Sequence, residues 1–257
     1  LAHNILGTKR NVRHFTPERL RAFLQSRYTP ERMVVTVAAD IDFDRLVRLC
    51  EKYFGQYSND AAAELKRDPK PEFKLFERHV NRHTHQAHVL LGCAAPDIYN
   101  RRKTAFTLLN NILGGPAMNS RLNVAIRERY GFCYSIESQY VPFSDAGLFY
   151  VYAGVDLDAQ ERVCHLIKDE LRRMADTALT ATALRQAQRQ FIGQMAINND
   201  NGLNEMQSIG KAFLCFDKVD TIEEMAADIM AVSPDDLRST AAEAFADNRF
   251  STLIYGN

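Results

Sequence analysis

The sequence predicts an α+β fold, in which a mixed or antiparallel sheet carries helices on one face. Three observations lead to this class. The expected strands come in neighbouring pairs, the expected helices come in runs, and a helix followed by a strand occurs near both ends of the 257-residue chain. Strands and helices do not alternate regularly, which disfavours a doubly wound parallel sheet. We therefore expect strand pairing largely through hairpins.

A repeat relates the two ends of the chain. Residues 16–21 read TPERLR, and residues 233–238 read SPDDLR. Each copy opens with a hydroxyl residue that can cap a helix and a proline suited to the first helical turn. At equal spacing behind the two copies, apolar runs predict buried strands over residues 32–39 and 249–257. We therefore expect the tail of one domain followed by a complete second copy of it.

The first part of the chain predicts two helices and a linker. The helices are expected over residues 16–27 and from Asp42 or Phe43 to Phe54, with Gly55 ending the second. Residues 58–71 are polar and contain two prolines, which is typical of a linker. The predicted organisation is therefore 1–57 as the end of a first domain, 58–71 as the linker and 72–257 as the second domain.

The second part predicts the sheet and most of the helices. A helix ending before Gly114-Gly115 and a helix ending before Gly131 separate two pairs of strands. Residues 182–216 are expected to be mostly helical but weakened around 198–202, where Asn, Asp and Gly cluster. In order, the remaining expected elements are strands 73–78 and 86–93, helices 101–113 and 119–130, hairpin strands 134–140 and 147–155, helix 158–177, helix 221–230, and the final helix and strand.

Composition indicates an ordinary globular protein. Hydrophobic residues make up 46% of the chain, and 32 basic residues balance 32 acidic ones. This balance gives no sign of a nucleic-acid partner, and no apolar run approaches the ~20 residues that span a membrane.

The five cysteines lack CxxC spacing, so we expect buried, reduced thiols and a reducing compartment such as the cytoplasm. These cysteines are Cys50, Cys93, Cys133, Cys164 and Cys215.

Residues 79–88 hold the one cluster that resembles a metal site. His83 and His85 would share one face of a strand. No carboxylate or cysteine completes a closed ligand set at useful spacing, so an exposed strand is the favoured interpretation.

Two segments carry a resemblance to a known family. Residues 114–122 read GGPAMNSRL, and residues 126–136 read IRERYGFCYSI. They resemble the second domain of the pitrilysin/insulinase family of zinc metallopeptidases, which includes the mitochondrial processing peptidases. That domain typically carries a Gly-rich segment, then Ser-Arg-Leu, then R-E-x-x-G-L-x-Y-S-V. Phe132 stands here for the Leu and Ile136 for the Val.

The resemblance implies that the zinc machinery lies outside this chain. The family's zinc motif is His-x-x-Glu-His, and none of the seven histidines here takes part in such a motif. Zinc is then expected in a missing N-terminal half or on a paralogous subunit, with no cofactor in this chain. The absence of an initiator Met adds the expectation that the chain is a piece of a longer protein.

The resemblance also assigns candidate site residues. Arg127 and Tyr134 would hold the substrate backbone, and the tyrosine would help stabilise the oxyanion, because a guanidinium fork and a phenol can both donate hydrogen bonds. Their places on either side of Gly131 let both side chains project from one corner. The alternative is a surface arginine and a packed tyrosine. Further substrate contacts are expected at Gly114, Gly115, Ser120 and Arg121; for the two glycines the alternative is a helix cap and turn.

The implied function is the C-terminal, substrate-chamber half of a zinc-dependent endopeptidase, inactive alone. An alternative is a natural non-catalytic subunit or peptide-binding partner of a zinc-bearing paralogue, and a third is a scaffold domain without peptide binding. Expected partners are a peptide substrate and a zinc-bearing domain or subunit. A homo-oligomer is a further possibility, because residues 1–57 would leave a strand edge exposed.

Overall fold

The structure is a computed structural model that describes residues 4–57, 73–246 and 249–256. The described residues form two compact units. Unit 1 contains residues 4–57 and 199–219, and unit 2 contains the rest. The sequence instead places residues 199–219 with the second domain. The predicted linker, 58–71, lies outside the described residues and stays a prediction.

Unit 2 is built on a mixed sheet, as predicted. Its described strands follow the order β1-β5-β2-β4-β3, with β1 and β5 parallel and the other neighbours antiparallel. The β3–β4 hairpin agrees with the sequence. The strands are β1 (Glu77–Asn81), β2 (Ala87–Ala95), β3 (Cys133–Pro142), β4 (Gly147–Val155) and β5 (Ser251–Gly256).

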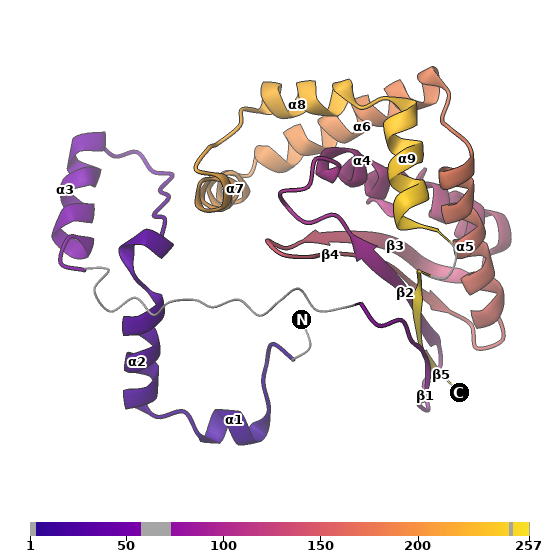
Figure 1. The fold of residues 1–257 in the computed structure, drawn as a ribbon, viewed down its shortest axis with the longest axis horizontal. Helices are drawn as coiled ribbons and strands as arrows, with labels where there is room; N and C mark the ends of the chain where they lie inside the picture. The colour runs from indigo at the N-terminus through magenta and orange to yellow at the C-terminus, as the bar shows by residue number, and fades with distance from the viewer. Residues whose placement is uncertain (1–3, 58–72, 247–248, 257) are drawn as a thin grey trace. The chain divides into compact units, whose positions relative to one another are not determined.

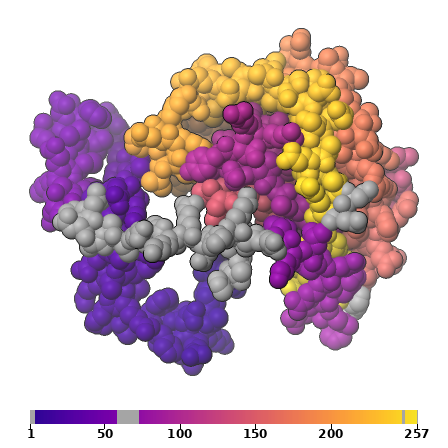
Figure 2. All heavy atoms as spheres, in the orientation of Figure 1, coloured from indigo at the N-terminus to yellow at the C-terminus, as the bar shows by residue number. Residues whose placement is uncertain are grey.

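The helices of unit 2 lie on one face of this sheet (Figure 1). The space-filling view shows the surface of this layer, in which α4 contacts both α8 and α9 (Figure 2). Helices on a single face confirm the predicted architecture. The helices are α4 (Lys103–Gly114), α5 (Gln160–Asp176), α6 (Ala181–Asn199), α8 (Ile222–Ala231) and α9 (Pro234–Ala244).

The core lies between the sheet and the helices. In β4, Phe149 and Val151 are fully buried, while their neighbours Leu148 and Tyr150 are only partly buried. Phe106 of α4 lies edge-on to Phe149, with 5.7 Å between the ring centroids. Fully burying one such side chain contributes about 1.5–3 kcal/mol. The period-2 pattern of the strands therefore directs one face of the sheet toward the helices.

The helix caps of the terminal repeat are confirmed, but only one of its strands forms. Thr16 and Ser233 both cap helices, α2 (Pro17–Arg27) and α9. Residues 251–256 form β5 between two neighbours. The predicted strand 32–39 is wrong: its first residue belongs to a 3₁₀ turn, η1 (Pro30–Arg32), and residues 33–38 pair with no strand in the described part of the chain. An apolar run needs a ladder partner to become a strand.

The strand predicted over residues 73–78 is displaced toward the C-terminus. β1 runs over Glu77–Asn81, because its parallel partner β5 begins at Ser251 and places Thr252 opposite Glu77. Just before β1, the N–H of Phe76 donates to Ser251 Oγ at 3.2 Å. Pairing with β5, rather than local propensity, therefore sets the bounds of this strand.

Unit 1 is helical where it is regular. Asn201 caps α7 at the weak point predicted within residues 182–216, because its side-chain oxygen accepts hydrogen bonds from the N–H groups of Leu203 and Asn204. Many apolar side chains of this unit are exposed, including Phe43, Tyr53 and Leu203. The helices are α1 (Lys9–Arg13), α2, α3 (Phe43–Phe54) and α7 (Gly202–Phe216).

Candidate functional site

Arg127 lies in a widened turn of its helix. Residues 121–130 are helical, as predicted, but η2 (Asn123–Glu128) has π geometry. The N–H of Arg129 donates to the carbonyl of Val124, five residues back. Ile126 is fully buried and holds the helix on the core, while Arg127 keeps part of its side chain in solvent. Such π turns frequently mark functional sites.

Gly131 ends this helix in a left-handed conformation. Its φ is +68°, and its N–H donates to the carbonyl of Arg127 at 2.9 Å. A Cβ placed at Gly131 would meet nothing within 4 Å. The backbone conformation, rather than crowding, therefore favours glycine here.

Tyr134 lies in a bulge at the start of β3. Cys133 pairs with Val155 and Ser135 with Gly154, which leaves Tyr134 without an opposite residue in β4. Cys133 is 6% exposed and Tyr134 is 75% exposed. Regular alternation back from Ile136 would instead turn Tyr134 toward the helices. The bulge therefore directs the phenol into solvent.

The Cys133 thiol, at the start of β3, has a raised pKa. Burial raises the pKa of the Cys133 thiol to about 11, and the positive Arg127 partly opposes this rise. A thiol with so high a pKa is a poor nucleophile at neutral pH, so Cys133 is unsuited to catalysis. The turn η2, which carries Arg127, packs against β3.

The glycines predicted to contact substrate also have packing roles. A Cβ on Gly114 would lie 2.4 Å from the backbone N of Ser138 in β3, so the end of α4 approaches the sheet there more closely than a side chain allows. Gly115 follows as the C-cap residue of α4. The helix cap and turn expected as the alternative are therefore present, and contact with a substrate stays a prediction for both residues.

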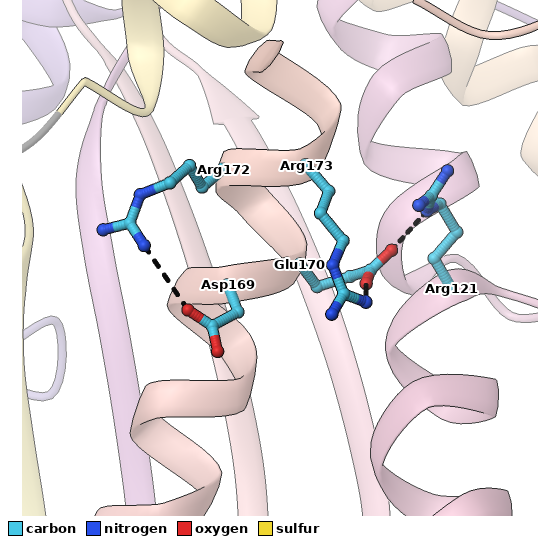
Figure 3. A network of polar contacts seen from close by, with 5 residues as sticks. All are labelled: Arg121, Asp169, Glu170, Arg172 and Arg173. Carbon is cyan, nitrogen blue, oxygen red and sulfur yellow. Dashed lines mark hydrogen bonds and ion pairs between the residues drawn. The ribbon is translucent and has the colours of Figure 1, made fainter. Parts of the chain in front are cut away.

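Ser120 and Arg121 have partners within unit 2. Ser120 is buried, and its Oγ accepts a hydrogen bond from Asn123 Nδ2 at 2.8 Å. Arg121 donates through Nε to the carboxylate of Glu170 in α5 (Figure 3). Their predicted contact with substrate is untested. Sequence reasoning missed Glu170, although an acidic residue between Ile167 and Leu171 on an apolar helix face is a readable signal.

The described residues do not fit a zinc site. Among them, no group of three or more His, Cys, Asp or Glu side chains could hold a metal ion. His83 and His85 are exposed, and His88 Nδ1 lies 2.8 Å from the hydroxyl of Tyr152. None of the five described cysteines forms a disulfide; Cys93, Cys133 and Cys164 are buried as expected, but Cys50 and Cys215 are only partly buried. No described helix has the length and apolar character to cross a membrane.

One known protein family matches most of this chain. Residues 14–191 match the family described as the peptidase M16 inactive domain. The chain belongs to this family. The prediction that it resembles the C-terminal portion of a zinc metallopeptidase is thereby confirmed, and the matching M16 domain is the inactive type.

Relatives of this M16 chain extend beyond it. An uncharacterized zinc protease of Streptomyces coelicolor is 33% identical over 249 residues, which cover 95% of this chain and 54% of the relative. Another, from Bacillus subtilis, is 29% identical over 254 residues, covering 99% and 61%. The chain therefore spans little more than half the length of these relatives.

Solved structures share the fold of the M16 chain. A peptidase M16 inactive domain from Pseudomonas fluorescens superposes with a TM-score of 0.86 at 18% identity, covering 99% of this chain and 61% of that one. A protease from Helicobacter pylori gives a TM-score of 0.79 at 17% identity, covering 97% and 61%.

Proposed function

We propose that this chain is the metal-free half of a zinc-dependent endopeptidase, in which Arg127 and Tyr134 bind the backbone of a peptide substrate. The observation that carries this proposal is the corner around Gly131. A π turn that contains Arg127, a left-handed glycine and a β-bulge at Tyr134 follow one another along the chain there. Each departs from regular geometry, and a domain that served only as a wall would not need them.

The two side chains suit the chemistry of peptide binding. Arg127 offers several donors in a fixed plane, which can bind backbone carbonyls of an extended peptide. Tyr134 can donate a hydrogen bond to a carbonyl oxygen as that oxygen gains negative charge. Its large exposure leaves the hydroxyl accessible to a ligand.

Zinc and its ligands would come from the part of the relatives' length that this chain lacks, or from a separate subunit. The described residues supply no zinc site, and the named relatives are zinc proteases whose chains extend beyond the matched region. The exposed apolar side chains of unit 1, such as Phe43 and Tyr53, are available for burial against that zinc-bearing part.

The test is peptide hydrolysis by the protein that joins this chain to its zinc-bearing part. Tyr134→Phe removes one hydroxyl donor, and we expect a loss of about 10²-fold in kcat/KM with unchanged thermal unfolding. Arg127→Gln should cause a similar loss. Tyr255→Phe is the matched control, because Tyr255 is another exposed strand tyrosine of the same sheet.

Wild-type rates in both the Tyr134 and the Arg127 variants would reject the proposed role and favour a scaffold domain. Rates that fall equally in the Tyr255 control would show a general effect on the sheet instead.

A further inference from the structure

Glu170 is a charged side chain at a core position. It is 3% exposed, and it is the one acidic or basic residue among the buried side chains of the described chain. It lies on the face of α5 that also buries Ile167, Leu171 and Met174. A carboxylate in such surroundings is strongly unfavourable unless cations and hydrogen bonds compensate it.

Two guanidinium groups compensate Glu170. Its Oε1 accepts from Arg121 Nε, and its Oε2 accepts from Arg173 Nη1 at 3.1 Å. Figure 3 shows the carboxylate between the two arginines. Arg173 lies one turn further along α5 and is largely exposed, whereas Arg121 belongs to the helix that carries η2. The bond to Arg121 therefore joins two elements.

This bond holds the start of the helix on which Arg127 lies. Nearby, Asn123 Nδ2 donates to Ser120 Oγ, and Asn119 Nδ2 donates to Gln190 Oε1 in α6, both at 2.8 Å. The bonds of Asn119 and Arg121 join the start of the helix to α6 and α5, and the π turn begins at Asn123, just after them. With the start held in place, the wide turn displaces its own later residues, including Arg127, relative to a regular helix.

We propose that Glu170 is a positioning residue for Arg127: through Arg121 it fixes the start of the helix, and so the position of the π turn that carries Arg127 where this turn packs against β3. The expected effect of Glu170 on peptide hydrolysis rests on the proposed function. A buried ion pair adds little stability compared with apolar residues of similar size, so orientation is the property that it contributes here.

The first test measures hydrolysis by the protein joined to its zinc-bearing part. Glu170→Gln keeps the size of the side chain and removes its charge. We expect kcat/KM to fall about tenfold, with the same division between kcat and KM as in Arg127→Gln. Asp169→Asn is the matched control, because Asp169 is the next residue of α5 and forms an exposed pair with Arg172 at 3.4 Å. It should leave the rate unchanged.

A double variant, Arg121→Met with Glu170→Met, separates position from stability. Apolar replacement of both partners is expected to keep the wild-type unfolding temperature but not the wild-type rate. Wild-type rates in this double variant would overturn the proposal. If instead the double variant unfolds early, the rates of Glu170→Asp and Glu170→Gln decide: recovery with the shorter carboxylate supports positioning, and equal loss in both contradicts it.

The second test needs no peptidase activity. In this chain alone, the Nε–Hε NMR signal of Arg127, assigned with Arg127→Lys, reports the surroundings of the guanidinium. Glu170→Gln should shift this signal and Asp169→Asn should not. An unchanged signal in Glu170→Gln would refute positioning. A shifted signal together with a wild-type assembly that cleaves no peptide would reject the proposed function alone.

Discussion

At the residue scale, Gly131 joins the π turn of Arg127 to the bulge of Tyr134 with a φ of +68°. Gly131→Ala should lower the free energy of unfolding by about 1–2 kcal/mol, because a Cβ disfavours the left-handed region. No atom within 4 Å would clash with that Cβ, so the loss is conformational. Urea unfolding followed by circular dichroism measures it.

The same substitution at Gly193 is the control. Gly193 also has no atom within 4 Å of an added Cβ, but it lies inside α6. Alanine there should raise the free energy of unfolding by about 0.5–1 kcal/mol. Gly131→Asn should lose less than Gly131→Ala, because asparagine tolerates the left-handed region. Equal effects of alanine at the two glycines would contradict this account.

At the scale of elements, one buried side chain joins α6 to the end of α8. Gln188 Nε2 donates to the carbonyls of Ile229 and Val232, both at 2.9 Å, and lies 3.3 Å from that of Met230. These carbonyls at and just beyond the C-terminal turn of α8 gain partners in this way. Gln188→Met keeps the length but removes the donors, so we expect a loss of about 1–3 kcal/mol of unfolding free energy.

Gln186→Met on the same helix is the control for this prediction. Gln186 is exposed, so its replacement should change the unfolding free energy by less than about 0.5 kcal/mol. Chemical denaturation of both variants compares them directly. A Gln188→Met variant as stable as Gln186→Met would show that the carbonyls find other partners, such as water.

At the scale of the whole molecule, local sequence signals predicted most helices and strands. Contacts between residues distant in the sequence decided which apolar segments became strands and how the helices are joined. Ser233 with its proline predicted the start of α9, and paired strands with runs of helices predicted the one-sided sheet. The segment 32–39 reads as a strand but has no described ladder partner. The π turn was hidden, because Leu122 and Ile126 keep ordinary helical spacing across it. The Arg121–Glu170 bond joins residues 49 apart, beyond the reach of local periodicity.

Zinc should also leave the thermal stability of this chain unchanged. A ligand that binds only the native state at 100 times its Kd adds about 2.7 kcal/mol to the unfolding free energy. The described residues hold no three-ligand group that could provide this gain. Calorimetry of this chain with a chelator and with excess zinc should therefore give the same unfolding midpoint, while the same chelator should abolish hydrolysis by the protein that includes the zinc-bearing part. A midpoint that rises with stoichiometric zinc in this chain alone would place a metal site within it. That result would contradict the proposal that zinc is bound only by the other half of the peptidase.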